Sequence, residues 1–177
     1  MSTAGSDNIV GTVKLNLGCG ERWKDGFINV DAFNPADMIV DLNSFPWPWE
    51  DNTVDEIYSR GCFEHLQDFN AALREAHRVL KPGGRLQIIV PHFRNPQAAW
   101  PQQHIHQFSI YTFTHHLSQS NEYSGNPPFS TVSVRHIYLD SRLSIFNRLA
   151  NISPLGWEWV GLPTMECEWV AEKAVAL

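Results

Sequence analysis

Short apolar runs separated by turn-forming residues dominate the first half of the chain. The runs at 13–17, 27–31 and 37–42 are rich in β-prone side chains, and Gly, Asp, Asn or Pro bounds each of them. Runs of this length and composition predict β-strands. Two further runs, at 53–59 and 85–91, have the same character. The pattern therefore predicts five strands in this part of the chain.

A helical pattern separates the fourth and fifth of these runs. Phe69, Leu73, Ala76 and Leu80 recur every three or four positions, and a Pro-Gly-Gly sequence at 82–84 follows them. Such spacing predicts a helix that ends at the proline and glycines. A strand, a helix and a strand in this order predict a βαβ unit, and hence a mostly parallel sheet with helices on its faces.

The last third of the chain is less regular. Residues 129–139 alternate like a strand, residues 141–151 have helical spacing, and residues 165–175 have the character of a final strand. The two strand-like segments predict a hairpin-like pair at one edge of the sheet.

Length and composition limit the domain organisation. A chain of 177 residues suits one domain with a single core, and no low-complexity tract or Gly/Ser linker divides it. We predict a flexible N-terminal segment at 1–12, which begins with small and polar residues, followed by a single domain at 13–177.

Cysteine content, charge and hydropathy exclude several function classes. Cys19, Cys62 and Cys167 are widely separated and lack C-x-x-C spacing, so they predict reduced thiols rather than a disulfide framework or a zinc knuckle. A net charge of −6 without Lys/Arg runs disfavours nucleic-acid binding. No apolar segment reaches the length of a membrane span, and the first residues do not resemble a signal peptide. These features favour a cytoplasmic protein without membrane attachment.

The segment LNLGCG, Leu15 to Gly20, places two glycines directly after the first predicted strand. In an open parallel sheet, ligands bind beyond the carboxyl ends of the strands, where a glycine turn lets backbone N–H groups approach the ligand. Asp31 ends the second predicted strand, where a carboxylate can accept hydrogen bonds from a ribose diol. These positions predict a nucleoside-type ligand.

Three classes of nucleoside ligand fit this arrangement to different degrees. A dinucleotide fingerprint requires a third glycine where Trp23 stands, and an acidic residue later in the chain than Asp31. A nucleotide P-loop requires a Lys-Ser or Lys-Thr pair that does not follow these glycines. A nucleoside without phosphates needs only the close turn, a diol acceptor and an adenine pocket. S-adenosylmethionine is therefore the favoured ligand.

Five segments in this order resemble the class I S-adenosylmethionine-dependent methyltransferases, in particular their small type-11 branch. The segments are LNLGCG, FINVD, IVDLN, FPWPWEDNTVDEIYSRGCFEHL and EAHRVLKPGGRLQIIVPH, within residues 13–117. The resemblance implies a Rossmann-like three-layer α/β sandwich, whose mostly parallel seven-stranded sheet has an antiparallel last strand. The stretch 21–26 has room for only one or two helical turns. We therefore expect an abbreviated first helix and thin cover on one face of the sheet, a candidate partner surface.

The resemblance also implies the cofactor site. Nine positions match the family's cofactor-binding motifs: Asn16, Gly18, Cys19, Gly20, Asp31, Asp41, Leu42, Arg60 and Gly61. The first four would form the turn against the methionine part of S-adenosyl-L-methionine. Asp31 would bind the ribose hydroxyls, and Asp41 with the backbone of Leu42 would meet the adenine. Arg60 and Gly61 would line the methionine side.

A histidine-rich tract at 91–116 follows the fifth predicted strand. Methyl transfer is an in-line displacement, and it needs a base only if the acceptor still holds its proton. His92 and His104 are our candidates for that base because imidazole titrates near neutral pH; the alternative is that each is a surface or hydrogen-bonding residue. His104 and His106 could chelate a metal, but no Cys or acidic residue lies close to them in sequence. We therefore expect no metal site.

We predict an enzyme that transfers a methyl group from S-adenosylmethionine to a small-molecule acceptor. One alternative is aminopropyl transfer from the same cofactor, for which only Glu64 follows the fourth strand as an acidic residue. Another is a non-catalytic S-adenosylmethionine-binding subunit that supports a partner enzyme. A homodimer or a complex with a partner protein is compatible with the sequence, which does not identify the acceptor or its reacting atom.

Overall fold

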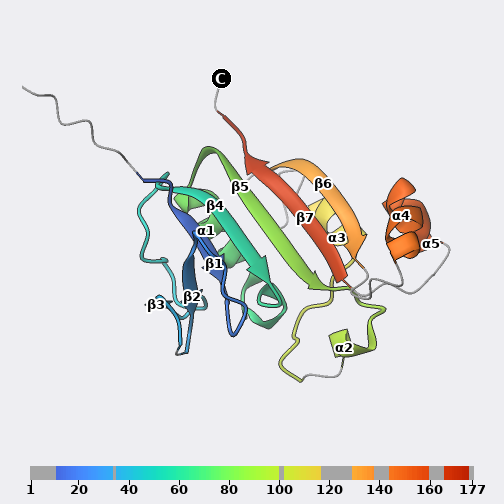
Figure 1. Ribbon diagram of the computed structural model, residues 1–177, viewed down its shortest axis with the longest axis horizontal. Coiled ribbons are helices and arrows are strands. Elements are labelled where there is room, and N and C mark those ends of the chain that lie inside the picture. The colour runs from blue at the N-terminus through green and yellow to red at the C-terminus, as the bar shows by residue number, and fades with distance from the viewer. Residues whose placement is uncertain are drawn as a thin grey trace, which may run out of the picture.

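A seven-stranded sheet with the strand order β3-β2-β1-β4-β5-β7-β6 organises the chain (Figure 1). The computed structural model describes residues 11–33, 35–99, 102–116, 129–137, 144–159 and 166–175. The strands are β1 Lys14–Leu17, β2 Ile28–Asp31, β3 Met38–Ile39, β4 Val54–Arg60, β5 Leu80–Pro91, β6 Phe129–Ile137 and β7 Glu166–Lys173. Strands β1 to β5 pair in parallel, and β7 runs antiparallel to both β5 and β6. The predicted mostly parallel sheet with an antiparallel last strand is confirmed.

The described residues form six helices between the strands. They are the 3-10 helix η1 Phe63–His65 and the α-helices α1 Phe69–Val79, α2 Pro96–Ala99, α3 Ile110–His116, α4 Ser144–Ile152 and α5 Pro154–Trp159. Helix α1 begins where Asp68 accepts a hydrogen bond from the N–H of Ala71 at 2.8 Å, which satisfies a donor that the helix cannot pair internally. Within the described residues, no helix is both long and apolar enough to cross a membrane.

Two predicted strands differ clearly in their bounds from the structure. The third strand is only Met38–Ile39, because the chain leaves the sheet at Val40 and enters a loop that continues to Thr53. The fifth strand starts at Leu80, which pairs with Val54 of β4 ahead of the Pro-Gly-Gly sequence. The predicted pair of C-terminal strands at one edge of the sheet is confirmed: β7 pairs antiparallel with β6, and β6 forms the edge. The predicted N-terminal segment 1–12 lies mostly outside the described residues.

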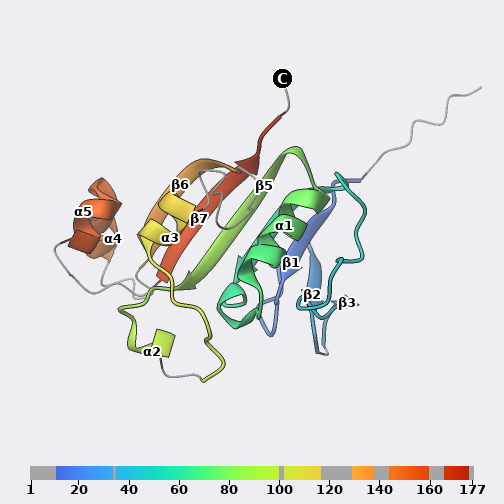
Figure 2. The same cartoon turned by 180° about the vertical axis from the view of Figure 1, so that it is seen from behind.

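Helices α1 and α3 cover one face of the sheet (Figure 2). The positions Leu15, Ile57, Leu86 and Trp169 face this side and are fully buried. Trp169 stacks on Phe113 of α3 with ring centroids 5.7 Å apart. Apolar burial on this side supplies the main driving force for folding.

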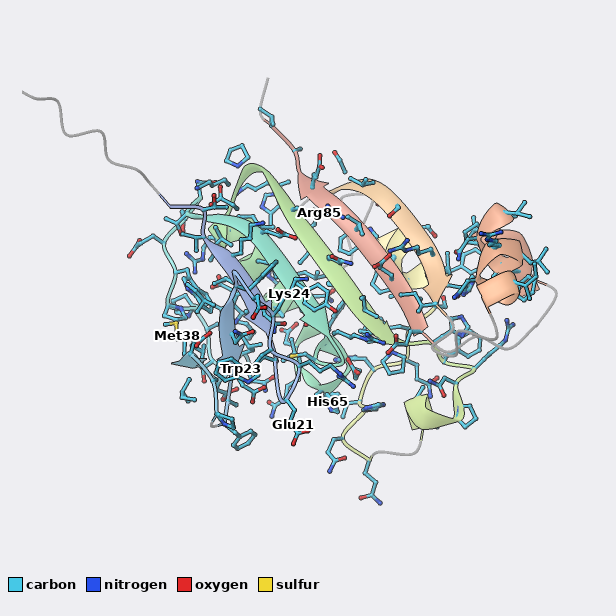
Figure 3. The ribbon with its side chains drawn as sticks, viewed as in Figure 1. Glu21, Trp23, Lys24, Met38, His65 and Arg85 are labelled. Carbon is cyan, nitrogen blue, oxygen red and sulfur yellow. The ribbon has the colours of Figure 1, made fainter. Side chains whose placement is uncertain are left out.

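The opposite face of the sheet is polar and carries no helix of the described residues (Figure 1). Paired positions on β1, β4, β5 and β7 form a row of alternating charge: Lys14, Glu56, Arg85 and Glu172. Lys14 Nζ lies 2.9 Å from Glu56 Oε2, and Figure 3 shows Lys24 and Arg85 on this side of the sheet. Of the three layers expected, the described residues thus form the sheet and one helical layer. The segment 21–26, where we expected an abbreviated first helix, forms turns and contains no helix.

The loop between β3 and β4 is held on the end of α1 by Arg78. Its guanidinium donates to both carboxylate oxygens of Glu75 at 2.9 and 2.7 Å, to the carbonyls of Trp47 and Trp49 at 3.0 and 2.9 Å, and to Asp51 at 2.7 Å. The Trp47 ring is buried, and its Nε1 donates to the carbonyl of Leu42. This loop follows Asp41 and Leu42, so its anchoring positions the start of the candidate site.

Candidate functional site

A cavity of about 730 Å³ opens beyond the carboxyl ends of β1, β2 and β4. Its volume is in the range of pockets that hold nucleoside-sized ligands, roughly 300–1,000 Å³. Most of the predicted cofactor residues line it: Gly18, Cys19, Gly20, Asp31, Asp41, Leu42 and Gly61. Residues from four separate segments therefore converge on one cavity, as expected at the carboxyl edge of a parallel sheet.

Gly18 brings the backbone close to the segment that follows β4. Its φ of +66° is in the left-handed region, and a Cβ at this position would lie 2.4 Å from both Cβ and Sγ of Cys62. Gly20 also has a positive φ, +47°, but no heavy atom lies within 4 Å of the position that a Cβ would take there. The left-handed conformation thus favours glycine at both positions, and the short distance to Cys62 also leaves no space for a side chain at Gly18.

Asp31 is fixed at the end of β2 with unused acceptor capacity. Its Oδ2 accepts from the N–H of Gly20 at 2.8 Å, and its Oδ1 accepts from the N–H of Phe33 at 3.1 Å. A carboxylate offers about four acceptor positions. Asp31 therefore ties the glycine turn to β2 and still has capacity for two hydroxyl donors in the cavity.

The next wall of the cavity combines a carboxylate with apolar side chains. Asp41 accepts from the N–H of Asn43 at 2.9 Å, which fixes its orientation in a turn. Val40 and Leu42 line the cavity on either side of Asp41, and Phe33 lines it from the end of β2 with 78% of its surface exposed. A flat apolar ring with polar edges fits between such groups.

Two predicted cofactor residues do not line the cavity. Asn16 is buried, and its Nδ2 donates to the carbonyl of Arg22 and to Oδ1 of Asn29, both at 2.8 Å. It holds the segment after the glycine turn against β2. Arg60 ends β4, but its Nη2 forms an ion pair with Glu166 of β7 at 2.8 Å, which turns the guanidinium away from the cavity.

Arg22 is a cavity residue that the sequence did not reveal. It lines the cavity, and its Nη1 lies 3.1 Å from the position that a Cβ on Gly61 would take. Gly61, with φ +71°, therefore leaves room for the guanidinium. The residue follows the glycine turn without any motif of its own, so only the fold identifies it as a cation in the cavity.

The two predicted base candidates have different surroundings. His92 is fully buried at the end of β5, accepts from the N–H of Arg94 at 3.2 Å, and packs against the His136 ring. It does not line the cavity, and this placement does not favour a role as base. His104 is half-buried and lies edge-on to His65, with ring centroids 4.6 Å apart.

His65 and its neighbour Glu64 were not assigned a site role from the sequence. His65 lines the cavity, and Glu64 beside it is 2% exposed. Burial, with a smaller contribution from the negative charge of Glu166, raises the pKa of Glu64 to about 7. Burial lowers the pKa of His65. Their sequence signal was only that they follow β4 within the segment GCFEHL.

The cysteines near the cavity are poor nucleophiles. Burial raises the pKa of the Cys62 thiol to about 12, and burial together with the charge of Asp31 raises that of Cys19. Thiolates, not thiols, carry cysteine reactivity. Both residues therefore act as small packing groups beneath the turn.

Part of the chain matches a known domain family. Residues 30–88 match a family model described as a methyltransferase domain. Over 73 residues the chain is 40% identical to phosphoethanolamine N-methyltransferase 3 of Arabidopsis thaliana, a match that covers 41% of this chain and 13% of that protein. Over 42 residues it is 50% identical to the uncharacterized protein YafE of Escherichia coli K12, covering 24% of this chain and 20% of that protein. The matches thus span a fifth or less of the length of these two curated relatives.

The fold is similar to solved structures over nearly its whole length. A SAM-dependent methyltransferase from Archaeoglobus fulgidus superposes with a TM-score of 0.65 and 16% identity, covering 92% of this chain and 87% of that one. Identity this low shows the fold alone. The family match and the shared fold agree with the resemblance drawn from the sequence motifs.

Proposed function

We propose that this chain, which has the fold of the class I S-adenosylmethionine-dependent methyltransferases and matches their domain family, transfers a methyl group from S-adenosylmethionine to a small-molecule acceptor. The observation that carries the proposal is the convergence of the glycine turn and two carboxylates, Asp31 and Asp41, on one cavity. The match over 30–88 starts within β2 and ends within β5, so it includes both carboxylates.

The described residues fit each part of this cofactor. The two free acceptor positions of Asp31 would take the ribose hydroxyls, and the backbone of Gly18 and Gly20 would lie against the methionine part. The adenine would pack between Phe33, Val40 and Leu42, with Asp41 at its polar edge. Adenine stacking against an aromatic ring adds roughly 0.5–1.5 kcal/mol beyond area burial.

Arg22 extends the proposed site beyond the family motifs. The methionine part of the cofactor carries a carboxylate, and a guanidinium in the cavity can bind one through two parallel hydrogen bonds. Arg22 lies next to Gly61, on the side where the methionine part would extend. Asn16 would act indirectly, by holding the carbonyl of Arg22 and hence the course of this segment.

The bound cofactor would supply a methyl group on a sulfonium, which a nucleophile displaces in line. The chain's contribution to such a reaction is to align the acceptor and exclude water. His65 on the cavity wall, with His104 beside it, marks the side where an acceptor would enter. Of the two predicted bases, His104 is therefore the one we retain. The net charge of −6 favours a neutral or cationic small molecule over a nucleic acid.

Cofactor binding is the direct test. The protein is titrated with S-adenosylmethionine and with S-adenosylhomocysteine by calorimetry, and its melting temperature is recorded with and without each. We expect both ligands to bind and to raise the melting temperature, because a ligand that binds only the folded state stabilises it. The absence of binding at saturating concentration would refute the proposal.

Asp31→Asn provides the residue-level version of this test. The variant should bind the cofactor roughly 10- to 100-fold more weakly, because hydrogen bonds to a charged group contribute about 1.5–3 kcal/mol. Asp25→Asn is the matched control, since Asp25 is exposed and does not line the cavity. Equal affinities for the two variants would remove Asp31 from the site.

A non-catalytic subunit is the second candidate function, and the polar face of the sheet, which no helix of the described residues covers, favours it. In that case the protein would bind the cofactor but would transfer no methyl group to any member of an acceptor panel that includes amines, phenols and sugars. Methyl transfer to one class of acceptor would exclude this candidate and identify the reacting atom.

A further inference from the structure

We propose that Glu64, His65 and His104 form a binding site for a divalent transition-metal cation at the edge of the cavity. One ligand atom from each residue lies within 4.8 Å of the others. The site rests on this geometry alone and does not depend on the proposed cofactor. Two imidazoles and one carboxylate are a donor set that suits zinc and its first-row neighbours.

The carboxylate of Glu64 points to a missing partner. Glu64 is 2% exposed, and its Oε2 is buried without a hydrogen-bond partner in the described structure. A buried polar atom without a partner is costly, and a cation would satisfy it. Arg22 and Glu166 are the charged groups whose fields act on this carboxylate, but neither forms an ion pair with it among the described residues.

Each histidine has a backbone contact at Nδ1 of the kind that supports metal-ligating histidines. Nδ1 of His65 lies 3.1 Å from the carbonyl of Gln103, and Nδ1 of His104 lies 3.3 Å from the carbonyl of Ala98. A carbonyl oxygen only accepts, so each Nδ1 must carry the proton. In the neutral ring, Nε2 then holds the lone pair that binds a metal, and such a backbone contact commonly fixes metal-ligating histidines.

Hydrogen bonds also hold the two ligand-bearing segments together. The carbonyl of Glu64 accepts from the N–H groups of Ile105 and His106 at 2.9 and 3.3 Å. Nε2 of His106 lies 2.7 Å from the carbonyl of Leu66. The η1 helix and the segment that carries His104 are thus fixed to each other before any ion binds, which reduces the entropy lost on binding.

Small side-chain rotations would complete the site. Ligand atoms about 2.1 Å from a zinc ion lie roughly 3–3.5 Å from one another, which is about 1.3–1.8 Å closer than the present limit of 4.8 Å. His65 is exposed and lines the cavity, so remaining coordination positions would face it. If the proposed function holds, an oxygen atom of the acceptor would take such a position, and His104 would then be a metal ligand instead of the base retained above.

The test is metal binding by the full chain without a polyhistidine tag. After removal of metals with a chelator, the protein is titrated with Zn²⁺ by calorimetry, and Co²⁺ is added separately as a spectroscopic probe. We expect one equivalent of Zn²⁺ to bind, and the visible absorption of Co²⁺ to become that of a site with nitrogen ligands. Failure of the folded wild-type protein to retain either ion would overturn the proposal.

Variants assign the ligands. Glu64→Gln and His104→Gln should each weaken Zn²⁺ binding more than about 100-fold. This exceeds the roughly 10- to 100-fold loss expected when a residue only supports a metal ligand. His77→Gln is the control: it removes a histidine from helix α1, outside the cluster, and should bind Zn²⁺ as the wild type does. Unchanged binding by the first two variants, or equal loss in the control, would contradict the site.

A measurement on the wild type covers the case in which a variant does not fold. Zn²⁺ should shift the ring nitrogen resonances of His65 and His104 in NMR spectra, while those of His77 on the far end of α1 stay unchanged. If only histidines other than His65 and His104 shifted, the ion would bind elsewhere, and this result would refute the assignment. Because these readouts involve neither cofactor nor activity, their outcome is separate from that of the proposed function.

Discussion

At the scale of single residues, Gly18 combines a positive φ with a Cβ contact shorter than 3.0 Å, a combination found at no other glycine of the described ranges. Its φ is +66°, and a Cβ would meet Cys62 at 2.4 Å. Gly26 has a similar φ of +76°, but no heavy atom lies within 4 Å of its Cβ position. The two positions therefore separate the conformational requirement for glycine from the steric one.

Gly18→Ala and Gly26→Ala measure these two contributions. Gly26→Ala should lower the free energy of unfolding by about 1–2 kcal/mol, the cost of an L-residue in the left-handed region. Gly18→Ala should cost at least about 1 kcal/mol more, because overpacking adds to the same strain. Chemical denaturation measures both values. Equal losses would show that the turn can move away from Cys62 without penalty.

Phe33→Ala tests the proposed adenine wall. Phe33 is 78% exposed, so its removal should leave the free energy of unfolding within about 0.5 kcal/mol of the wild type. S-adenosylmethionine should bind roughly 3- to 10-fold more weakly, since the ring would stack on the adenine. Phe93→Ala is the control, because Phe93 is also exposed but does not line the cavity. An unchanged dissociation constant for Phe33→Ala would exclude stacking.

The sequence predicted those residues of the candidate site whose type is required by the backbone conformation or by a position at the end of a strand. The glycines and Asp31 belong to this class, and the structure brings them to one cavity. Arg22, Phe33 and His65 have no such signal, because their side chains reach the cavity only through loops whose course the sequence does not specify. His104 meets Glu64 and His65 from a separate segment, so its acidic neighbour is close in space and distant in sequence.

At the scale of elements, Arg78 joins helix α1 to the loop after β3. It contacts Glu75 within the helix, and it contacts Trp47, Trp49 and Asp51 in the loop. Hydrogen bonding to Glu75, the largest cause, raises the pKa of Arg78, and the same contact lowers that of Glu75. The planar fork of arginine makes these contacts simultaneously, whereas lysine has a single nitrogen.

Arg78→Lys should therefore destabilise the protein although it retains the charge. We expect a loss of about 1–3 kcal/mol in the free energy of unfolding, because several acceptors, most of them partly buried, lose their donor. Arg74→Lys is the control on the same helix, where the nitrogen of Arg74 lies 3.9 Å from Asp68 and the side chain is 45% exposed. Thermal denaturation of both variants measures the difference. A loss at Arg78 no larger than that at Arg74 would show that the loop is held by packing alone.

At the scale of the whole molecule, the polar side of the sheet is the side that no helix of the described residues covers. Lys14, Asn16, Tyr58, Arg85 and Gln87 occupy this side of β1, β4 and β5. Alternation of this kind is typical of a sheet with one solvated face, and it was visible in the segments VKLNL and RLQIIVP. The expectation of three layers came from the family resemblance, while the mostly parallel sheet and the α/β class followed from the βαβ pattern and are confirmed.

Asp55 links this surface to the pH dependence of stability. Its carboxylate accepts two hydrogen bonds from Lys81 Nζ at 2.8 Å and one from the N–H of Val13. The contact with Lys81 is the largest cause that lowers its pKa. A depressed carboxyl pKa contributes stability above the unfolded value, about 3.9, and this contribution is lost as the pH falls through the folded value.

Asp55→Asn should accordingly reduce stability at pH 7 by about 1 kcal/mol. The difference from wild type should begin to shrink as the pH falls below about 3.9 and should vanish below the folded pKa of Asp55. Denaturant unfolding at a series of pH values measures this. Asp25→Asn, at an exposed position, controls for the loss of one negative charge. A deficit that persists unchanged at low pH would mean that packing, not ionisation, causes the effect.

The position of β7 between β5 and β6 has a consequence for synthesis on the ribosome. Strand β6 pairs only with β7, so it cannot join the sheet until the segment Glu166–Lys173 has been translated. Until then the long strand β5 remains an open edge, and Trp169 is missing from the aromatic cluster beneath it. Open edges of this kind template association with other chains. A nascent chain that stalls shortly before Glu166 should therefore depend on chaperones far more than the completed chain.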